Sequence, residues 1–257
     1  MSEIDVGEGQ PEVRPPRVWA SRRELRMPFE LVNSVARTRV LRGWPRGDGH
    51  SVVVVPGFLA GAESTAFLRN HLGRLGYQVS DWGLGRNSGV TRARTEAFAR
   101  RVAELRERSG RKVSIVGWSA GGIYAREMGR LHPDQVRCVI TMVTPFNVHL
   151  TETPAWKLYL MVNRGSHDET LFTDEVVRLR GRPLSLPTTS IYTKDDGIIA
   201  WQSCVGEPAP LNEAVEVRGS HLGTVHQIDS IRVIADRLAQ PEGDWRPYAQ
   251  ARDSHRN

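Results

Sequence analysis

The sequence predicts an α/β fold with a mostly parallel central sheet of about six strands, helices on both faces and a small helical cap insertion. Short runs of β-branched residues, such as SVVVV at 51–55, are typical of strands that are covered on both faces. These runs alternate with helical patterns such as 91–109, where Phe98, Val102 and Leu105 share one face. Strands that alternate with helices favour parallel pairing.

The elements of the first half follow from these two patterns. The spacing of apolar residues predicts helices at about 27–41 and 63–75, and the turn-rich segment GWPRGDGH separates the first helix from the strand at 51–55. A short apolar run predicts a strand at 77–80, before the helix at 91–109. The first half therefore contributes two strands and three helices.

The second half continues the alternation. Apolar runs predict strands at 112–116, 136–143, 188–193 and 214–218. Helical periodicity predicts a helix at 120–131, which Pro133 ends, and a last helix at about 224–239. The six predicted strands are enough for one central sheet.

The length of 257 residues suits one large domain, which we expect over 21–240. Polar, proline-bearing and aperiodic segments at 1–20 and 241–257 are interpreted as tails. The segment 146–186 is long for one crossover and contains the apolar stretch TPAWKLYLMVN. We therefore expect it to form a cap-like helical insertion over one edge of the sheet.

Charge and cysteine content argue against several classes of function. The formal net charge is +6, but 32 of the 35 basic residues are arginines, spread along the chain and interleaved with acids, so we expect no nucleic-acid partner. Two cysteines without a CxxC or Cys/His cluster predict no metal site, and no cofactor is expected. The longest apolar run, 52–59, is broken by Pro56 and Gly57, which predicts no transmembrane segment; with no signal peptide in 1–20, a cytoplasmic location is expected.

The most informative motif is G-x-S-x-G at 117–121, directly after a predicted strand and before a predicted helix. A sharp turn between strand and helix holds a serine in a strained conformation with its hydroxyl exposed, and the flanking positions must be small because backbone approaches there. Ser119 is therefore the candidate nucleophile. The alternative is a plain glycine-rich turn.

A serine nucleophile needs a base, and the base needs an acid that orients it. Asp196 follows the strand at 188–193 and His221 follows the last strand, so the order along the chain is Ser, Asp, His. Asp196 is chosen over the adjacent Asp195 because the apolar residues after it would return the carboxylate toward the histidine. His226 falls in the helical pattern and is the less favoured base.

Hydrolysis also needs donors for a tetrahedral oxyanion. The strand at 51–55 ends in Pro-Gly, which would aim the backbone N–H of Phe58 toward the serine, and the N–H of Ala120 at the helix start is the second candidate donor. The glycine-rich loop at 82–89 should lie on the same rim of the sheet, where we expect it to border the substrate.

Six stretches over about 50–240 carry a family resemblance: VVVVPGF, DWGLGRN, VGWSAGGIYARE, HPDQVRCVITMVTPF, YTKDDGIIAW and GSHLG. With these motifs the chain resembles the α/β-hydrolase superfamily, specifically small bacterial-type lipases and esterases. The resemblance implies a triad of Ser119, Asp196 and His221 near the centre of a parallel sheet, with the Phe58 and Ala120 amides as the oxyanion hole. The antiparallel hairpin usual at the front of that sheet is not expected, because a helical and turn-rich segment precedes Ser51.

The leading hypothesis is a serine hydrolase of carboxylic esters with a small-molecule substrate that carries a hydrophobic acyl group. The apolar residues of the insertion, Trp156, Leu158, Leu160 and Phe172, are candidates for the wall of the acyl pocket. The alternatives are an acyltransferase or amidase that uses the same triad, and a non-catalytic binding module on the same fold.

Overall fold

The computed structural model describes residues 18–37, 43–147, 159–164 and 169–248. Its centre is a six-stranded sheet in the order β2-β1-β3-β4-β5-β6, and all five strand pairings are parallel. The strands are β1 (Ser51–Val55), β2 (Gln78–Asp81), β3 (Val113–Trp118), β4 (Val136–Met142), β5 (Thr188–Tyr192) and β6 (Asn212–Glu216). The prediction of a parallel α/β sheet of about six strands is confirmed.

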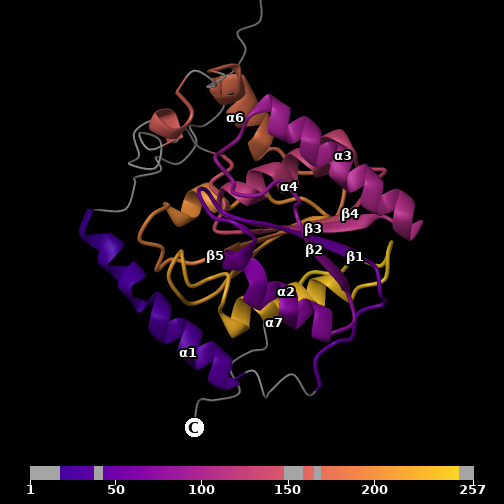
Figure 1. Cartoon of the computed structure of the whole chain (residues 1–257), viewed down its shortest axis with the longest axis horizontal. Coiled ribbons are helices and arrows are strands. Elements are labelled where there is room, and N and C mark those ends of the chain that lie inside the picture. Colours follow the sequence, from indigo (N-terminus) through magenta and orange to yellow (C-terminus); the bar gives the residue numbers. More distant parts are fainter. Residues whose placement is uncertain (1–17, 38–42, 148–158, 165–168, 249–257) are drawn as a thin grey trace, which may run out of the picture.

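Helices cover both faces of the sheet (Figure 1). The described α-helices include α1 (Met27–Arg37), α2 (Ala66–Arg74), α3 (Arg92–Ser109), α4 (Ala120–Leu131), α6 (Asp174–Gly181) and α7 (Ile228–Leu238). The 3₁₀ helices are η1 (Val18–Arg26), η3 (Ala62–Thr65), η4 (Glu169–Phe172) and η5 (Trp201–Cys204). Among the described residues, no helix is long and apolar enough to cross a membrane.

Alternation along β1 divides the core into two layers. Val52 and Val54 belong to the cluster that includes residues of α2 and α7, whereas Val53 and Val55 belong to the cluster that includes residues of α3 and α4. All four valines are fully buried. Successive side chains of a strand point to opposite faces, so only a strand covered on both sides tolerates an uninterrupted valine run.

Several element boundaries differ from the sequence prediction by a few residues, and three of the differences lie toward the two ends of the domain. The helical segment at the N-terminus begins at Val18 in η1, three residues before the expected start of the domain. β6 covers 212–216 rather than 214–218, and α7 begins at Ile228 rather than near 224. The residues before α7 form turns instead, because the Thr224 amide donates to the Ser220 carbonyl and the His226 amide donates to the Gly223 carbonyl. His226 is therefore outside the helix to which it was assigned.

The start of the segment predicted as a C-terminal tail packs against the domain. The backbone N–H of Tyr248 donates to the Glu213 carboxylate at 2.6 Å, and the Arg237 guanidinium lies 5.3 Å from the centre of the Tyr248 ring. These contacts bring 241–248 back onto β6 and α7.

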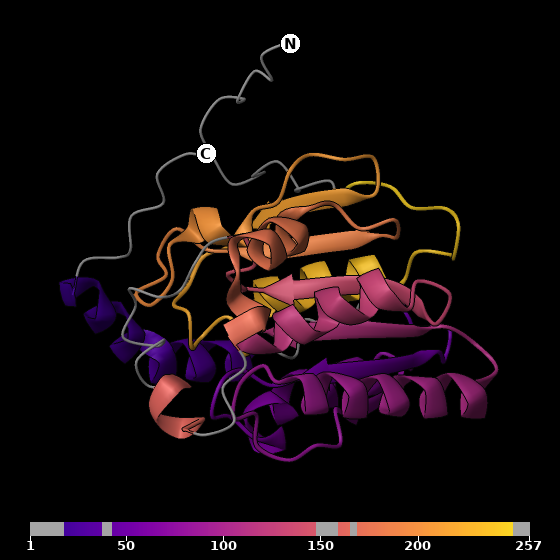
Figure 2. The ribbon, with the colours of Figure 1, turned by 90° about the horizontal axis from the view of Figure 1, so that it is seen from above.

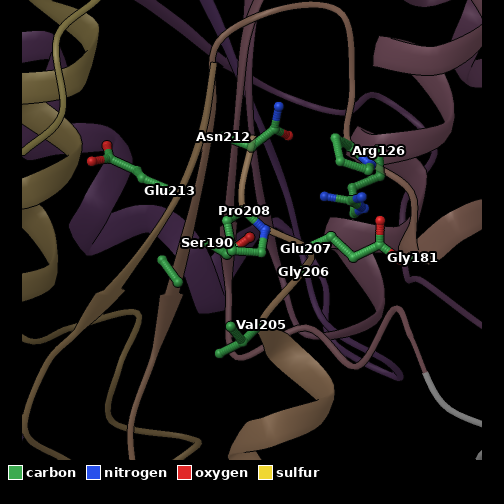
Figure 3. Close-up of a pocket in the computed structure, with 11 residues that line it drawn as sticks. Arg126, Gly181, Ser190, Val205, Gly206, Glu207, Pro208, Asn212 and Glu213 are labelled. Atoms are coloured by element: carbon green, nitrogen blue, oxygen red, sulfur yellow. The ribbon is translucent and has the colours of Figure 1, made fainter. Parts of the chain in front are cut away.

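The described part of the expected insertion at 146–186 contains helical segments: residues 159–162 are helical, and η4 and α6 follow. Two of the predicted pocket residues, Trp156 and Leu158, lie outside the described residues. The insertion is joined to the domain by Arg126 of α4, whose Nη2 donates to the carbonyl oxygens of Arg180 and Arg182 at 2.8 Å each. Figure 3 shows Arg126 beside Gly181, where it neutralises the carbonyl end of α6.

Candidate active site

The three residues of the predicted triad lie at the carboxyl ends of three strands. Ser119 directly follows β3, Asp196 comes four residues after β5, and His221 comes after β6. In a parallel sheet these strand ends share one edge, so residues that are far apart in sequence meet there. Figure 2 shows that the segment formed by η1 and α1 (indigo) also lies at this end of the sheet.

The turn at Ser119 is strained. Ser119 has φ 52° and ψ −124°, a left-handed conformation that non-glycine residues rarely adopt. Three glycines allow the close approach around it. A Cβ on Gly117 would overlap Gly122, one on Gly121 would overlap the Val55 carbonyl, and one on Gly122 would overlap Thr144. The motif therefore needs small residues because neighbouring backbone and side chains approach closely, as the sequence suggested.

A chain of hydrogen bonds joins the three side chains. His221 Nε2 lies 3.0 Å from Ser119 Oγ, and His221 Nδ1 lies 2.7 Å from Asp196 Oδ2. The second carboxylate oxygen, Asp196 Oδ1, accepts the backbone N–H groups of Ile198 at 2.8 Å and Ile199 at 2.7 Å. Both oxygens of the carboxylate are thus held, and the apolar return after Asp196 provides two of the donors.

Asp195, the alternative acid, and His226, the alternative base, make other contacts. Asp195 donates its backbone N–H to Thr193 Oγ1 at 3.1 Å, and it is the carboxylate of Asp196 that contacts His221. The His226 ring packs 5.9 Å from the ring of Phe67 in α2, and burial lowers the pKa of His226.

Burial and charge act in opposite directions on His221. The side chains of His221 and Asp196 are 4% and 2% exposed. Burial disfavours the charged imidazolium, but the carboxylates of Asp196 and, more weakly, Glu24 outweigh it, so the pKa of His221 is raised above its ordinary value. This arrangement favours an imidazole that accepts a proton from Ser119 and holds it as an ion pair with Asp196.

The turn after β1 lies beside the turn at Ser119. Leu59 has φ 59°, and its N–H donates to the Asn87 carbonyl at 2.6 Å. The Asn87 side chain donates to the Pro56 carbonyl at 2.7 Å. Within the described part of the chain, the N–H groups of Phe58 and Ala120 donate to no protein acceptor. Both therefore remain candidate oxyanion donors.

Trp118 connects this turn to the histidine loop. Its indole Nε1 donates to the His221 carbonyl at 3.3 Å, and a Cβ on Gly57 would lie 3.0 Å from its ring. The loop at 82–89, predicted to lie on the same rim, does so through Asn87, which binds the turn after β1. The rim of the site is therefore one connected set of loops.

Sequence reasoning missed two acidic residues of the N-terminal segment. The Glu24 carboxylate accepts the backbone N–H groups of Gly197, His221 and Leu222, and the Glu30 carboxylate accepts the N–H and the hydroxyl of Ser220. Neither glutamate belongs to a motif, and both lie more than 160 residues from the loops that they bind. No pattern in the sequence would have found them.

A second Ser–His–Asp chain lies at the opposite end of the sheet. His50 Nδ1 lies 2.5 Å from Asp48 Oδ1, and His50 Nε2 lies 2.8 Å from Ser114 Oγ. Ser114 and His50 are fully buried, and Ser114 lies inside β3 rather than at a turn. Asp48 also binds Arg111 and Arg137. Since no substrate reaches Ser114, this chain is a buried structural network.

The structure has a cavity away from the triad. A cavity of about 260 Å³, lined by residues such as Arg126, Ser190 and Asn212, contains none of the three triad residues in its wall (Figure 3). Among the described residues, no group of three or more His, Cys, Asp or Glu side chains could hold a metal ion.

The sheet, the strained serine turn and the connected loops are the features of an α/β hydrolase. The family model described as the alpha/beta hydrolase fold matches residues 50–178. The chain belongs to this family. No curated protein sequence matches it.

Solved structures agree with this assignment. Lipase B of Aspergillus fumigatus is similar over 79% of this chain and 56% of its own, at 17% identity and a TM-score of 0.57. The lipase BlEst2 of Bacillus licheniformis is similar over 76% of this chain and 94% of its own, at 15% identity and a TM-score of 0.54. A structure from a study of two metagenome-derived lipolytic enzymes, LipS and LipT, covers 76% of this chain and 93% of its own, at 15% identity and a TM-score of 0.53. At these identities the likeness establishes the fold.

Proposed function

We propose that this α/β hydrolase is a serine hydrolase of carboxylic esters, with Ser119 as nucleophile, His221 as general base and acid, and Asp196 as the residue that orients His221. The observation that carries the proposal is the unbroken chain of hydrogen bonds from Ser119 Oγ through the imidazole to Asp196, at 3.0 Å and 2.7 Å. The family assignment and the structural similarity to lipases support it.

In the acylation step, Ser119 Oγ attacks the ester carbonyl carbon while His221 Nε2 takes the hydroxyl proton. Asp196 keeps the other nitrogen, Nδ1, as the donor and stabilises the imidazolium. The tetrahedral intermediate collapses as His221 gives the proton to the departing alcohol. Water then attacks the acyl-enzyme by the same proton route and releases the acid.

The developing oxyanion is bound by the backbone N–H groups of Phe58 and Ala120. Because Asn87 holds the turn after β1 by hydrogen bonds and Ala120 begins α4, these donors need little reorganisation in the transition state. One donor of this kind typically contributes about 2.7–4 kcal/mol to the lowering of the barrier.

A cluster of aromatic rings beside Phe58 supports a substrate with an apolar acyl group. The Phe58 ring lies 6.2 Å from the ring of Tyr159, and Tyr159 lies 5.3 Å from Phe172 of η4. These three rings join the turn after β1 to the insertion. Leu160, one of the predicted pocket residues, is 36% exposed.

The test is hydrolysis of a panel of nitrophenyl esters from short to long acyl chains by the wild type and by Ser119→Ala. The proposal predicts turnover by the wild type that Ser119→Ala abolishes. Product analysis with added alcohols separates hydrolysis from acyl transfer, and amide substrates test amidase activity. A well-folded wild type without turnover on any of these substrates would favour a binding module.

A further inference from the structure

The Glu24 carboxylate bridges the two loops that carry Asp196 and His221. Glu24 Oε1 accepts the N–H of Gly197 at 3.0 Å and the N–H of His221 at 3.1 Å, and Oε2 accepts the N–H of Leu222 at 2.8 Å. Gly197 directly follows Asp196. A single side chain from η1 therefore binds the backbone beside both the acid and the base.

These bonds are of a strong kind. Hydrogen bonds from amides to a carboxylate are about twice as strong as those between neutral groups. Since the three donors come from two loops that follow different strands, the carboxylate fixes the spacing of the loops and hence the distance between Asp196 and His221.

A second carboxylate extends the same attachment. Glu30 of α1 accepts the Ser220 N–H at 3.0 Å and the Ser220 hydroxyl at 2.7 Å, one residue before His221. The outer side of the segment is solvent-exposed, as shown by Leu25, Phe29 and Val32, which are 74%, 78% and 70% exposed. The glutamates therefore lie on the inner side of the segment, and these three apolar side chains lie on its exposed side.

We propose that Glu24 is a positioning residue for the Asp196–His221 pair, and that the N-terminal segment η1–α1 is in this way a working part of the active site. This inference rests on the proposed function for its catalytic consequence. The effect of Glu24 on the geometry and the charge around His221 does not depend on the proposed function.

The charge of Glu24 should affect the pKa of His221, which a purely structural role of Glu24 would not do. Three carboxylates of the described residues bind His221 or its loop: Asp196 binds His221 Nδ1, and Glu24 and Glu30 bind the loop amides. Arg23 donates to the Lys194 carbonyl at 3.4 Å, in the loop that carries Asp196. Burial lowers the pKa of His221, whereas Asp196 and then Glu24 raise it. Removal of the Glu24 charge should therefore lower that pKa.

Two substitutions separate geometry from charge. In Glu24→Gln one carbonyl oxygen is kept, but the amide NH₂ replaces the other oxygen, so that it faces either the Leu222 N–H or the N–H groups of Gly197 and His221, and the charge is lost. Glu24→Asp keeps the charge but is one methylene too short to reach both loops. Glu107→Gln is the matched control, because Glu107 is an exposed carboxylate of α3 far from these loops.

The first measurement is the pH profile of kcat/KM on a nitrophenyl ester. Both Glu24 variants should lose activity on the order of ten- to hundredfold, mainly in kcat, because small displacements of reacting groups are costly. Glu24→Gln should also move the acidic limb to lower pH, whereas Glu24→Asp should leave it near the wild-type position. Wild-type rates and an unchanged acidic limb in Glu24→Gln would overturn the inference. A loss of activity that is fully explained by the fraction of unfolded variant protein would also overturn it.

The second measurement needs no turnover. NMR titration of the His221 imidazole should give a lower pKa in Glu24→Gln than in the wild type, in Glu24→Asp and in Glu107→Gln. If the wild type hydrolyses no ester, the proposed function fails, and this titration still decides whether Glu24 acts on His221. Equal titration curves in wild type and Glu24→Gln would contradict the inference.

Discussion

The side-chain amide of Asn87 donates to the carbonyl of Pro56 at 2.7 Å, across two loops that follow neighbouring strands. The Asn87 backbone binds the same turn, since its carbonyl accepts the Leu59 N–H and its N–H donates to the Ala60 carbonyl. Asn87 is fully buried. It therefore holds the turn that presents the Phe58 N–H to the proposed oxyanion.

Asn87→Ala should lower kcat on a nitrophenyl ester on the order of tenfold or more with little change in KM. The reason is that an oxyanion donor acts in the transition state and not on the bound substrate. Asn212→Ala is the control, because Asn212 also bonds backbone through a side-chain amide, but to Leu184 and away from the site. Equal kinetics for Asn87→Ala and the control would show that the turn needs no such support.

Asp196→Asn should reduce kcat on the order of 10³–10⁴-fold, because an amide at this position favours the wrong imidazole tautomer. Asp195→Asn should stay within a few-fold of the wild type, since only the carboxylate of Asp196 binds His221. Steady-state kinetics of the two variants decide this. If Asp195→Asn were the more damaging change, the assignment of the acid would be wrong.

The rate should depend on pH through His221. His221 must be neutral to accept the Ser119 proton, and its pKa is raised, mainly by Asp196 against the opposing effect of burial. Activity should therefore fall as the pH falls, with a midpoint in kcat/KM above the ordinary histidine value of about 6.5. His226→Ala should leave this limb in place. A midpoint below the ordinary value would contradict the environment described for His221.

The glycines of the serine turn should not tolerate a methyl group. Gly121→Ala should destabilise the fold by about 1–3 kcal/mol or more, because the new Cβ overlaps the backbone carbonyl of Val55. Gly73→Ala in α2 should be neutral or stabilising by up to about 1 kcal/mol, because nothing lies within 4 Å of the added Cβ. Urea unfolding of both variants compares them directly, and equal midpoints would contradict the close packing at Gly121.

Much of the fold follows from local patterns. The bounds of β1 and α4 agree with the prediction, because β1 is an unbroken valine run buried on both faces and α4 begins at the constrained serine turn. The bounds of β6 differ because this strand, NEAVE, lies at the sheet edge with mostly polar or exposed positions, where hydrophobic pattern gives little register.

The candidate site divides in the same way. Ser119, Asp196 and His221 each follow a strand, so the parallel topology alone brings them to the carboxyl end of the sheet. Glu24, Glu30 and Asn87 act through backbone groups of loops that are distant in sequence, and backbone acceptors and donors leave no trace in residue identity. Such contacts become visible only when the loops are placed in space.

The most direct test of the central claim is the identity of the serine that reacts with a fluorophosphonate probe. The described part of the chain contains two Ser–His–Asp arrangements, ending at Ser119 and at the buried Ser114, so peptide mapping of the labelled protein by mass spectrometry distinguishes them. We expect label on Ser119 alone, lost in Ser119→Ala and retained in Ser114→Ala. A well-folded wild type that takes up no label, or label that persists in Ser119→Ala, would contradict the account.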